Sequence, residues 1–222
     1  MSVQTLPVTL RASAATAVPT TEYSVHDTAK KTSTCTATTS NKLTDSTGLF
    51  TTTDAIAVGD IIKNTTTGKF ALVTAVDSAT ALSVSADIFS NTNAYTIYPG
   101  LGYKLQQVFR EMVVILDVTA AATDVGDTLD VYVDTSFDGG TSFVNIGHFT
   151  QVVGNGGAKK YIMSFKSNPI TSSNSVAFGT DQAASAALQI GWGDRLRVRA
   201  VTVDAGTQNV GFTYSVKAFL RV

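Results

Sequence analysis

The stretch Leu129–Phe149, LDVYVDTSFDGGTSFVNIGHF, decides the fold class of this chain. Hydrophobic and polar residues alternate over Leu129–Asp134, which is the period of a β-strand with one buried face. Asp138-Gly139-Gly140 interrupts the pattern, and a second extended run follows over Phe143–Phe149. Glycine reaches positive φ without steric penalty, and aspartate can hydrogen-bond its own turn backbone. The stretch therefore predicts a β-hairpin.

The same period of two recurs through the C-terminal part of the chain, and the strands it predicts cover residues 112–118, 160–165, 195–200 and 210–222. Apolar residues fill both alternating sets of 112–118, so we expect that strand to be buried on both faces. In the last strand, Phe212, Tyr214 and Val216 are expected to point inward. Asp181–Leu188 alone reads as a helix, with Asp181 as its N-cap. Residues 99–222 thus predict an antiparallel two-sheet sandwich, jelly-roll-like in character.

Residues 43–98 have a different character, because turn signals separate short strands throughout this region. Asn64–Gly68 and Asp77–Thr80 read as turns on either side of a strand over Phe70–Val76. Frequent turns between short strands predict a small β-barrel module. Gly59-Asp-Ile-Ile-Lys-Asn64 followed by Phe70-Ala-Leu-Val-Thr-Ala-Val-Asp77 resembles small β-barrel modules that are common in bacteriophage virion proteins.

Residues 1–42 are predicted to form an extended N-terminal arm. Val3–Leu10 suits one strand, which Pro7 would confine to the edge of a sheet, since proline cannot donate to a strand ladder. The small polar residues that follow bury too little apolar area to fold alone. Either the arm becomes ordered against another surface, or it is a loose tail with one edge strand.

Charge and cysteine content exclude several classes of function. The chain has 16 Lys and Arg against 17 Asp and Glu, a net charge of -1, which gives no electrostatic case for nucleic acid or a membrane surface. Cys35 is the single cysteine, so no disulfide within the chain is expected. No secretory signal is visible, and the aliphatic run Met112–Leu116 is too short to span a bilayer. A soluble protein made in the cytoplasm of its host is expected.

No catalytic, cofactor or metal residues are predicted. Ser136–Phe143 matches the Asp-box pattern of sialidase-like propellers, but the pattern occurs once where a propeller would repeat it, so a structural turn is expected. His26 and His148 accompany no recognisable catalytic motif. Four aspartates offer oxygen ligands for calcium without the spacing of an EF-hand, and a simple loop is the preferred interpretation; they are Asp124, Asp127, Asp130 and Asp134.

Arg195, Arg197 and Arg199 share one face of a predicted strand and are candidate interface residues. Three neighbouring guanidinium groups repel one another unless an anion lies close to them. One interpretation is local pairing with strand aspartates such as Asp117 or Asp130. The other is a contact stripe for an acidic partner subunit, because arginine pairs bidentately and is enriched at interfaces.

Three C-terminal segments together resemble a structural family of tailed bacteriophages, the small β-sandwich virion proteins; they are Thr128–Gly140, Asn145–Val152 and Gly211–Val216. The resemblance implies a non-enzymatic protein that decorates or stabilises the capsid, with a neck or tail component as the alternative. From the polar N-terminal arm and the arginine stripe we expect a homo-oligomer, with a trimer slightly favoured, that binds a major capsid or neck protein through the arm. A carbohydrate- or receptor-binding module is the second alternative, since jelly rolls also form lectins.

Overall fold

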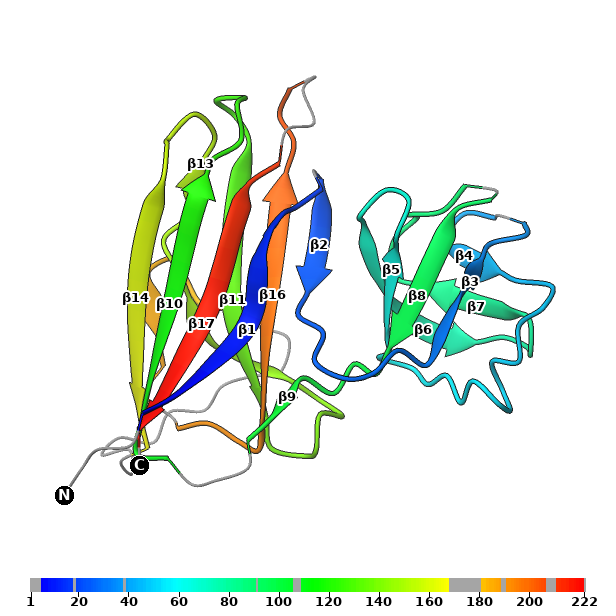
Figure 1. Cartoon of the computed structure of the whole chain (residues 1–222), viewed down its shortest axis with the longest axis horizontal. Coiled ribbons are helices and arrows are strands. Elements are labelled where there is room, and N and C mark those ends of the chain that lie inside the picture. The colour runs from blue at the N-terminus through cyan, green and yellow to red at the C-terminus, as the bar shows by residue number, and fades with distance from the viewer. Residues whose placement is uncertain are drawn as a thin grey trace.

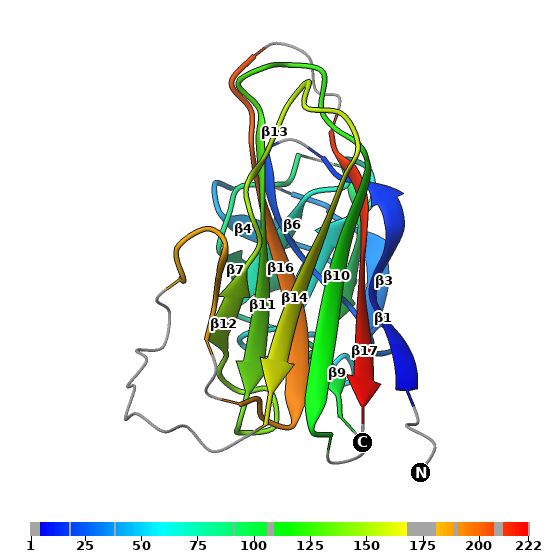
Figure 2. The same cartoon turned by 90° about the vertical axis from the view of Figure 1, so that its left-hand side faces the viewer.

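The computed structural model describes residues 5–17, 19–37, 39–90, 92–105, 109–167, 181–188, 191–206 and 211–221. All regular structure in these residues is β, arranged as antiparallel sheets. The chain forms two lobes that lie side by side (Figures 1 and 2). The larger lobe holds two of the sheets, and the smaller lobe holds a third, curled sheet.

The first sheet of the larger lobe has the strand order β1-β17-β10-β14. Its strands are β1 (Thr5–Ala15), β17 (Thr213–Arg221), β10 (Glu111–Ala120) and β14 (Lys159–Lys166). Thr5 lies opposite Arg221, so the start of β1 and the end of β17 share one end of the lobe. The edge strand predicted from Pro7 is confirmed, because β1 pairs with β17 alone in this sheet.

The second sheet has the order β15-β12-β11-β16-β2, with two short strands beside this path. Its strands are β15 (Ala186–Ala187), β12 (Val144–His148), β11 (Thr128–Ser136), β16 (Arg195–Val203), β2 (Thr20–Tyr23), β13 (Val152–Val153) and β9 (Tyr103–Lys104). β11 and β12 are antiparallel neighbours, which confirms the predicted hairpin. Both of its turn glycines, Gly139 and Gly140, have positive φ.

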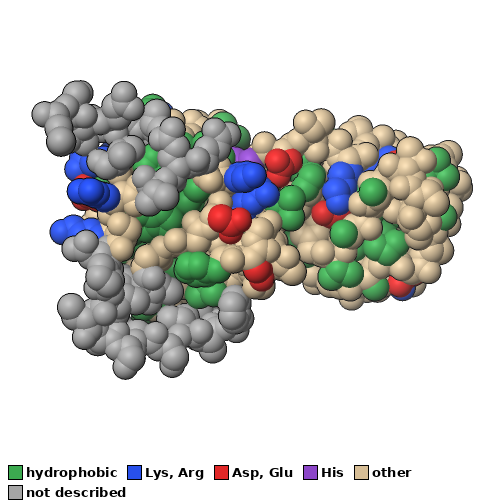
Figure 3. Space-filling model, turned by 90° about the horizontal axis from the view of Figure 1, so that it is seen from below, with side chains coloured by type: hydrophobic (Ala, Val, Ile, Leu, Met, Phe, Trp, Pro, Cys, Tyr) green, Lys and Arg blue, Asp and Glu red, His purple; other side chains and the backbone are tan. Residues whose placement is uncertain are grey.

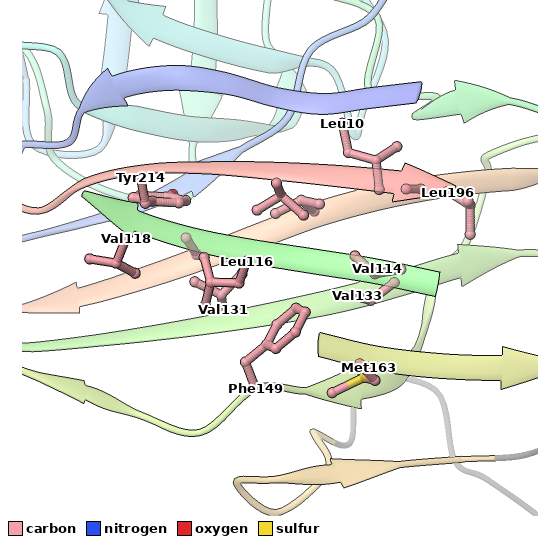
Figure 4. Close-up of a cluster of buried hydrophobic side chains, with 14 of the residues drawn as sticks. Leu10, Val114, Leu116, Val118, Val131, Val133, Phe149, Met163, Leu196 and Tyr214 are labelled. Carbon is pink, nitrogen blue, oxygen red and sulfur yellow. The ribbon is translucent and has the colours of Figure 1, made fainter. Parts of the chain in front are cut away.

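One hydrophobic core lies between the two sheets of the larger lobe (Figure 4). Leu116 from β10, Val131 from β11 and Tyr214 from β17 are all fully buried in it. Truncation of such a side chain to alanine typically costs about 2–5 kcal/mol. The inward set predicted for the last strand is confirmed, as Phe212, Tyr214 and Val216 are buried. Val210 and Val222 lie outside the described residues.

Burial of β10 on both faces is not observed. Its even-numbered residues from Met112 to Val118 are buried, whereas Val113, Ile115 and Asp117 are half-buried. The two flanking strands β17 and β14 cover the backbone of β10, but the described residues place no further sheet over its outer face. The apolar side chains on that face are shielded from solvent by neighbouring side chains alone.

The smaller lobe is a six-stranded curled sheet with the order β3-β8-β5-β6-β7-β4. Its strands are β3 (Lys31–Thr34), β8 (Ala94–Tyr98), β5 (Ile61–Asn64), β6 (Phe70–Val76), β7 (Ala81–Val84) and β4 (Lys42–Thr44). A bridge between Ala37 and Thr44 joins the chain that follows β3 to β4, the other end of the strand order. The lobe has its own core around Phe50, Leu82 and Tyr95.

The described part of the predicted N-terminal arm is not a separate segment. β1 belongs to the first sheet, β2 to the second and β3 to the smaller lobe. Leu10 of β1 is 1% exposed and packs in the core of the larger lobe, where β17 and β10 supply the apolar area that the arm itself lacks (Figure 4). The described residues 5–17 and 19–37 are therefore ordered against the same chain.

The predicted helix over Asp181–Leu188 is also wrong. Ala186 and Ala187 form β15, which pairs with His148 and Gly147 of β12. Ser185 has a φ of 66°, which no α-helix accommodates. Alanine favours a helix locally, but the exposed edge of β12 offers backbone hydrogen bonds that a short isolated helix cannot match.

Candidate functional site

The outer face of the second sheet carries two rows of polar and aromatic side chains. Side chains alternate along a strand, so burial of Leu196 and Val198 turns the arginines of β16 to the opposite face. In one row, the strand register aligns Tyr23, Arg199, Tyr132 and His148 across β2, β16, β11 and β12. In the next row, it aligns Arg197, Asp134 and Asn145.

Asp134 is the centre of these rows and is 2% exposed. Its Oδ2 accepts from Nη2 of Arg197 at 3.1 Å and from Nε of Arg199 at 3.4 Å. Its Oδ1 accepts from Nδ2 of Asn145 at 2.9 Å. Arg199 also donates through Nη2 to Asp181. Each carboxylate oxygen of Asp134 thus has a partner, as a buried charge requires.

Aromatic rings flank both guanidinium groups. The Arg197 guanidinium lies 3.8 Å from the centroid of Phe143, and that of Arg199 lies 4.1 Å from the centroid of Tyr132. Burial lowers the pKa of Arg199, but Asp134 and Asp181 outweigh that effect and raise the pKa above its ordinary value. Arg199 therefore stays charged, and the rings hold the two planar cations in fixed orientations.

His148 contacts three neighbouring residues. Its Nε2 lies 2.9 Å from Oδ1 of Asp130, its Nδ1 lies 2.9 Å from the carbonyl oxygen of Gln182, and its ring stacks on Tyr132 at a centroid distance of 4.2 Å. Both ring nitrogens are occupied, so His148 lacks the unpaired nitrogen that a general base uses.

His26 lies away from these rows, with its Nε2 3.1 Å from Oγ of Ser24. Burial lowers the pKa of His26. Ser24 is 5% exposed, and its hydroxyl oxygen accepts the backbone N–H of Val198 at 2.9 Å. A buried hydroxyl that already accepts a backbone N–H of β16 is poorly placed to attack a substrate. The contact fixes the chain where it leaves β2.

An open pocket of about 260 Å³ lies over the rows. It is lined by Tyr23, Asp134, Phe143, Asn145, Asp181, Arg197 and Arg199. The pocket combines ring faces with fixed hydrogen-bond donors and acceptors. This combination suits a small polar ligand with a flat or partly apolar face, such as a sugar.

The structure brings two of the three predicted arginines to one aspartate. Local pairing is thus observed for Arg197 and Arg199, but the partner is Asp134 rather than Asp117 or Asp130. Asp117 pairs with Lys160 and Asp130 with His148. The register between β11 and β16 places Asp134 opposite Arg197 and so determines which aspartate the arginines contact.

Arg195 lies apart from the Asp134 pairs. Its Nη1 donates to the carbonyl oxygen of Gly102 at 3.4 Å, while its buried Nε has no hydrogen-bond partner among the described residues. The arginine stripe is therefore a set of two paired side chains and one that contacts the connection between the lobes.

The four aspartates considered as calcium ligands separate into two places. Asp130 and Asp134 lie on the outer face described above. Asp124 and Asp127 lie together with Asp204 at the end of the lobe where β16 ends. The sequence offered no signal for Asp204, since only the fold brings its loop to the other two.

The Asp-box stretch forms a turn, as expected. Oδ1 of Asp138 accepts the backbone N–H of Ser142 at 2.9 Å, and Ser136 donates its hydroxyl to the same carboxylate. Hydrogen bonds from the side chain and backbone of Ser142, with that of Ser136, lower the pKa of Asp138 to about 2. Asp138 thus stabilises the hairpin connection.

Cys35 and Trp192 both have packing roles. Cys35 is 1% exposed, and burial raises the pKa of its thiol, which disfavours the reactive thiolate. Trp192 is partly buried and packs against the core of the larger lobe.

Comparison with known proteins gave no match, whether to family models, to curated proteins or to solved structures. The described residues contain no helix long and apolar enough to cross a membrane.

Proposed function

We propose that this chain is a non-enzymatic structural protein of a bacteriophage virion, in the first instance a capsid decoration protein. The observation that carries the proposal is the state of the charged groups on the outer face of the second sheet. Arg197 and Arg199 each pair with Asp134, and both ring nitrogens of His148 are hydrogen-bonded. A face whose carboxylate and imidazole groups are already paired suits lasting contact better than turnover.

The proposal includes the finer features expected from the sequence. These are a jelly-roll-like sandwich for the larger lobe, a homo-oligomer with a trimer favoured, and binding to a major capsid or neck protein in the virion. Figure 3 supports contact with proteins over contact with nucleic acid or membrane, because basic and acidic side chains are interspersed on the face it shows. Weak contacts repeated by symmetry would add through effective concentration.

The earlier expectation that an N-terminal arm makes the contact is revised. Since β1 and β2 are strands of the two facing sheets, their removal would unfold the larger lobe and any contact surface on it. Exposed side chains on the lobes are the better candidates for contact.

The direct test is the position of the purified chain on assembled particles. Particles that lack it would be incubated with it, and occupancy measured by cryo-electron microscopy. Symmetric density over the shell supports decoration, whereas density confined to one vertex or the tail supports the neck or tail alternative. No association with particles at saturating protein would overturn the proposal.

The pocket over Asp134 supports a second candidate function, a carbohydrate- or receptor-binding module. Phe143 lines this pocket, whereas Phe137 from the same hairpin connection is 58% exposed and does not. If a glycan array identifies a ligand, Phe143→Ala should weaken its binding at least tenfold, and Phe137→Ala should leave binding unchanged. Equal effects of the two substitutions, or no glycan ligand, would remove this candidate.

A further inference from the structure

Three aspartates meet at the end of the larger lobe where β11 begins and β16 ends, the top of Figure 1. Asp124 and Asp127 come from the connection between β10 and β11, and Asp204 directly follows β16. The carboxylate oxygens that they offer all lie within 4.8 Å of one another. Such proximity of like charges is unfavourable without a cation between them.

Asp127 supplies an independent observation. It is fully buried, and its Oδ1 accepts the backbone N–H of Ala205 at 3.0 Å. Its Oδ2 is buried as well, yet has no hydrogen-bond partner among the described residues. Burial of a carboxylate oxygen without a hydrogen-bond donor costs roughly several kcal/mol of folding free energy, unless a positive charge is bound to it.

The backbone around the cluster is closely packed. A Cβ on Gly154 would lie 1.7 Å from the carbonyl oxygen of Asp124, and a Cβ on Gly206 would lie 2.1 Å from Oδ2 of Asp124. Gly154 also donates its N–H to the carbonyl oxygen of Asp127 at 2.7 Å. Two glycines thus let the neighbouring loops approach the aspartates and hold the oxygens in place.

We propose that Asp124, Asp127 and Asp204 bind one Ca²⁺ ion. Calcium takes oxygen ligands at about 2.3–2.6 Å, so two ligands of one ion lie at most about 5 Å apart, which the 4.8 Å limit on this cluster satisfies. Magnesium demands nearly octahedral geometry and usually keeps several of its waters, so a site built from three protein carboxylates suits calcium better. Water and backbone carbonyls complete the coordination.

The site is structural in character. Asp127 and Asp134 are separated by the length of β11, which is on the order of 20 Å, so the ion does not touch a ligand in the pocket over Asp134. The bound ion links the connection that precedes β11 to the segment that follows β16. Bound calcium therefore raises the stability of the larger lobe and keeps this end of it rigid.

Titration of the full chain with CaCl₂ alone tests the site, after EDTA treatment and dialysis. We expect one ion per chain, with a Kd between about 10⁻⁵ and 10⁻³ M. At a hundredfold excess over Kd, the unfolding temperature should rise by about 5–10 °C. MgCl₂ at the same concentration should give a clearly smaller rise. Absence of both binding heat and a thermal shift at 10 mM CaCl₂, roughly ten times the weakest Kd expected, would overturn the proposal.

Two variants locate the ion. Asp127→Asn keeps an oxygen for the N–H of Ala205 but removes the charge, so it should fold and lose calcium binding at least tenfold. Gly206 is exposed, and Gly206→Ala would displace the carboxylate of Asp124, so it should weaken binding without unfolding the chain. Asp117→Asn, on the first sheet and paired with Lys160, is the matched control. Unchanged calcium affinity in both variants would place the ion elsewhere and refute the site.

Discussion

Arg11 and Glu22 form a buried ion pair that joins the edge strands of the two facing sheets. Nε of Arg11 lies 2.6 Å from Oε1 of Glu22, and Nη2 lies 3.0 Å from Oε2. The Arg11 guanidinium also stacks 3.6 Å from the ring centroid of Tyr214, whose hydroxyl donates to Glu22 at 3.3 Å. β1 and β2 are thereby fixed to each other and to β17 at the open side of the lobe.

Glu22→Ala should destabilise the larger lobe by about 3 kcal/mol, because it leaves the Arg11 charge buried without its carboxylate. Glu111→Ala is the matched control, since the Arg221–Glu111 pair on the same sheet is largely exposed and should contribute no more than about 1 kcal/mol. Urea unfolding of the three proteins measures both values. Equal destabilisation by the two substitutions would show that Arg11–Glu22 is no more than a surface pair.

Asp134→Ala should likewise destabilise the larger lobe by about 3 kcal/mol or more, because Arg197 and Arg199 both lose their shared carboxylate. Asp117→Ala removes a partly exposed partner of Lys160 and serves as the control, with an expected loss below about 1 kcal/mol. Thermal unfolding of each variant checks the difference. If Asp134→Ala were as stable as the control, the two arginines would have to be solvated rather than paired.

The smaller lobe should lose stability in acid through Asp45. Burial alone would raise the pKa of Asp45, but hydrogen bonds from Tyr95, Ser33 and Thr47 outweigh it and lower the pKa to about 2. The ordinary value is about 3.9 in an unfolded chain. The unfolded state therefore binds the proton first, and the contribution of Asp45 is complete above about pH 4 and is lost as the pH falls toward 2.

Hydrogen exchange of β8, measured from pH 5 to pH 2, follows this loss through the amide of Tyr95, after correction for the intrinsic exchange rate. Asp45→Asn should flatten the pH dependence between pH 4 and 2, because the amide does not titrate. Asp117→Asn, in the larger lobe, should leave it as in the wild type. If Asp45→Asn lost as much protection between pH 4 and 2 as the wild type, another carboxylate would be responsible for that loss.

The alternation of hydrophobic and polar residues predicted the strands, but it did not predict how they pair. Alternation along β11 and β16 identifies a buried face within each strand, because that period follows from the backbone alone. The pairing of Arg197 with Asp134 depends on the register between two strands, which a single sequence does not specify. For this reason the predicted partners of the arginines were the wrong aspartates.

The other errors arise from contacts between distant parts of the chain. The residues that follow Leu10 looked too polar to fold because the strands that pair with them, β17, β16 and β8, lie far along the sequence. The alanines near residue 186 favour a helix locally, but the free edge of β12 draws them into a strand. Asp204 joins Asp124 and Asp127 only because β16 ends where β11 begins.

The Asp138-Gly139-Gly140 connection allows a test of two different reasons for a glycine. Gly139 has a φ of 76° and no atom within 4 Å of an added Cβ, so Gly139→Ala should cost about 1–2 kcal/mol through backbone strain alone. Gly140 has a φ of 96°, and its Cβ would lie 2.5 Å from the carbonyl oxygen of Leu101. Gly140→Ala therefore adds a clash with the backbone of the connection between the lobes, and its loss in urea unfolding should be at least twice as large. A similar loss for both variants would mean that the connection at Leu101 yields without cost, and that the hairpin does not hold the chain between the lobes in place.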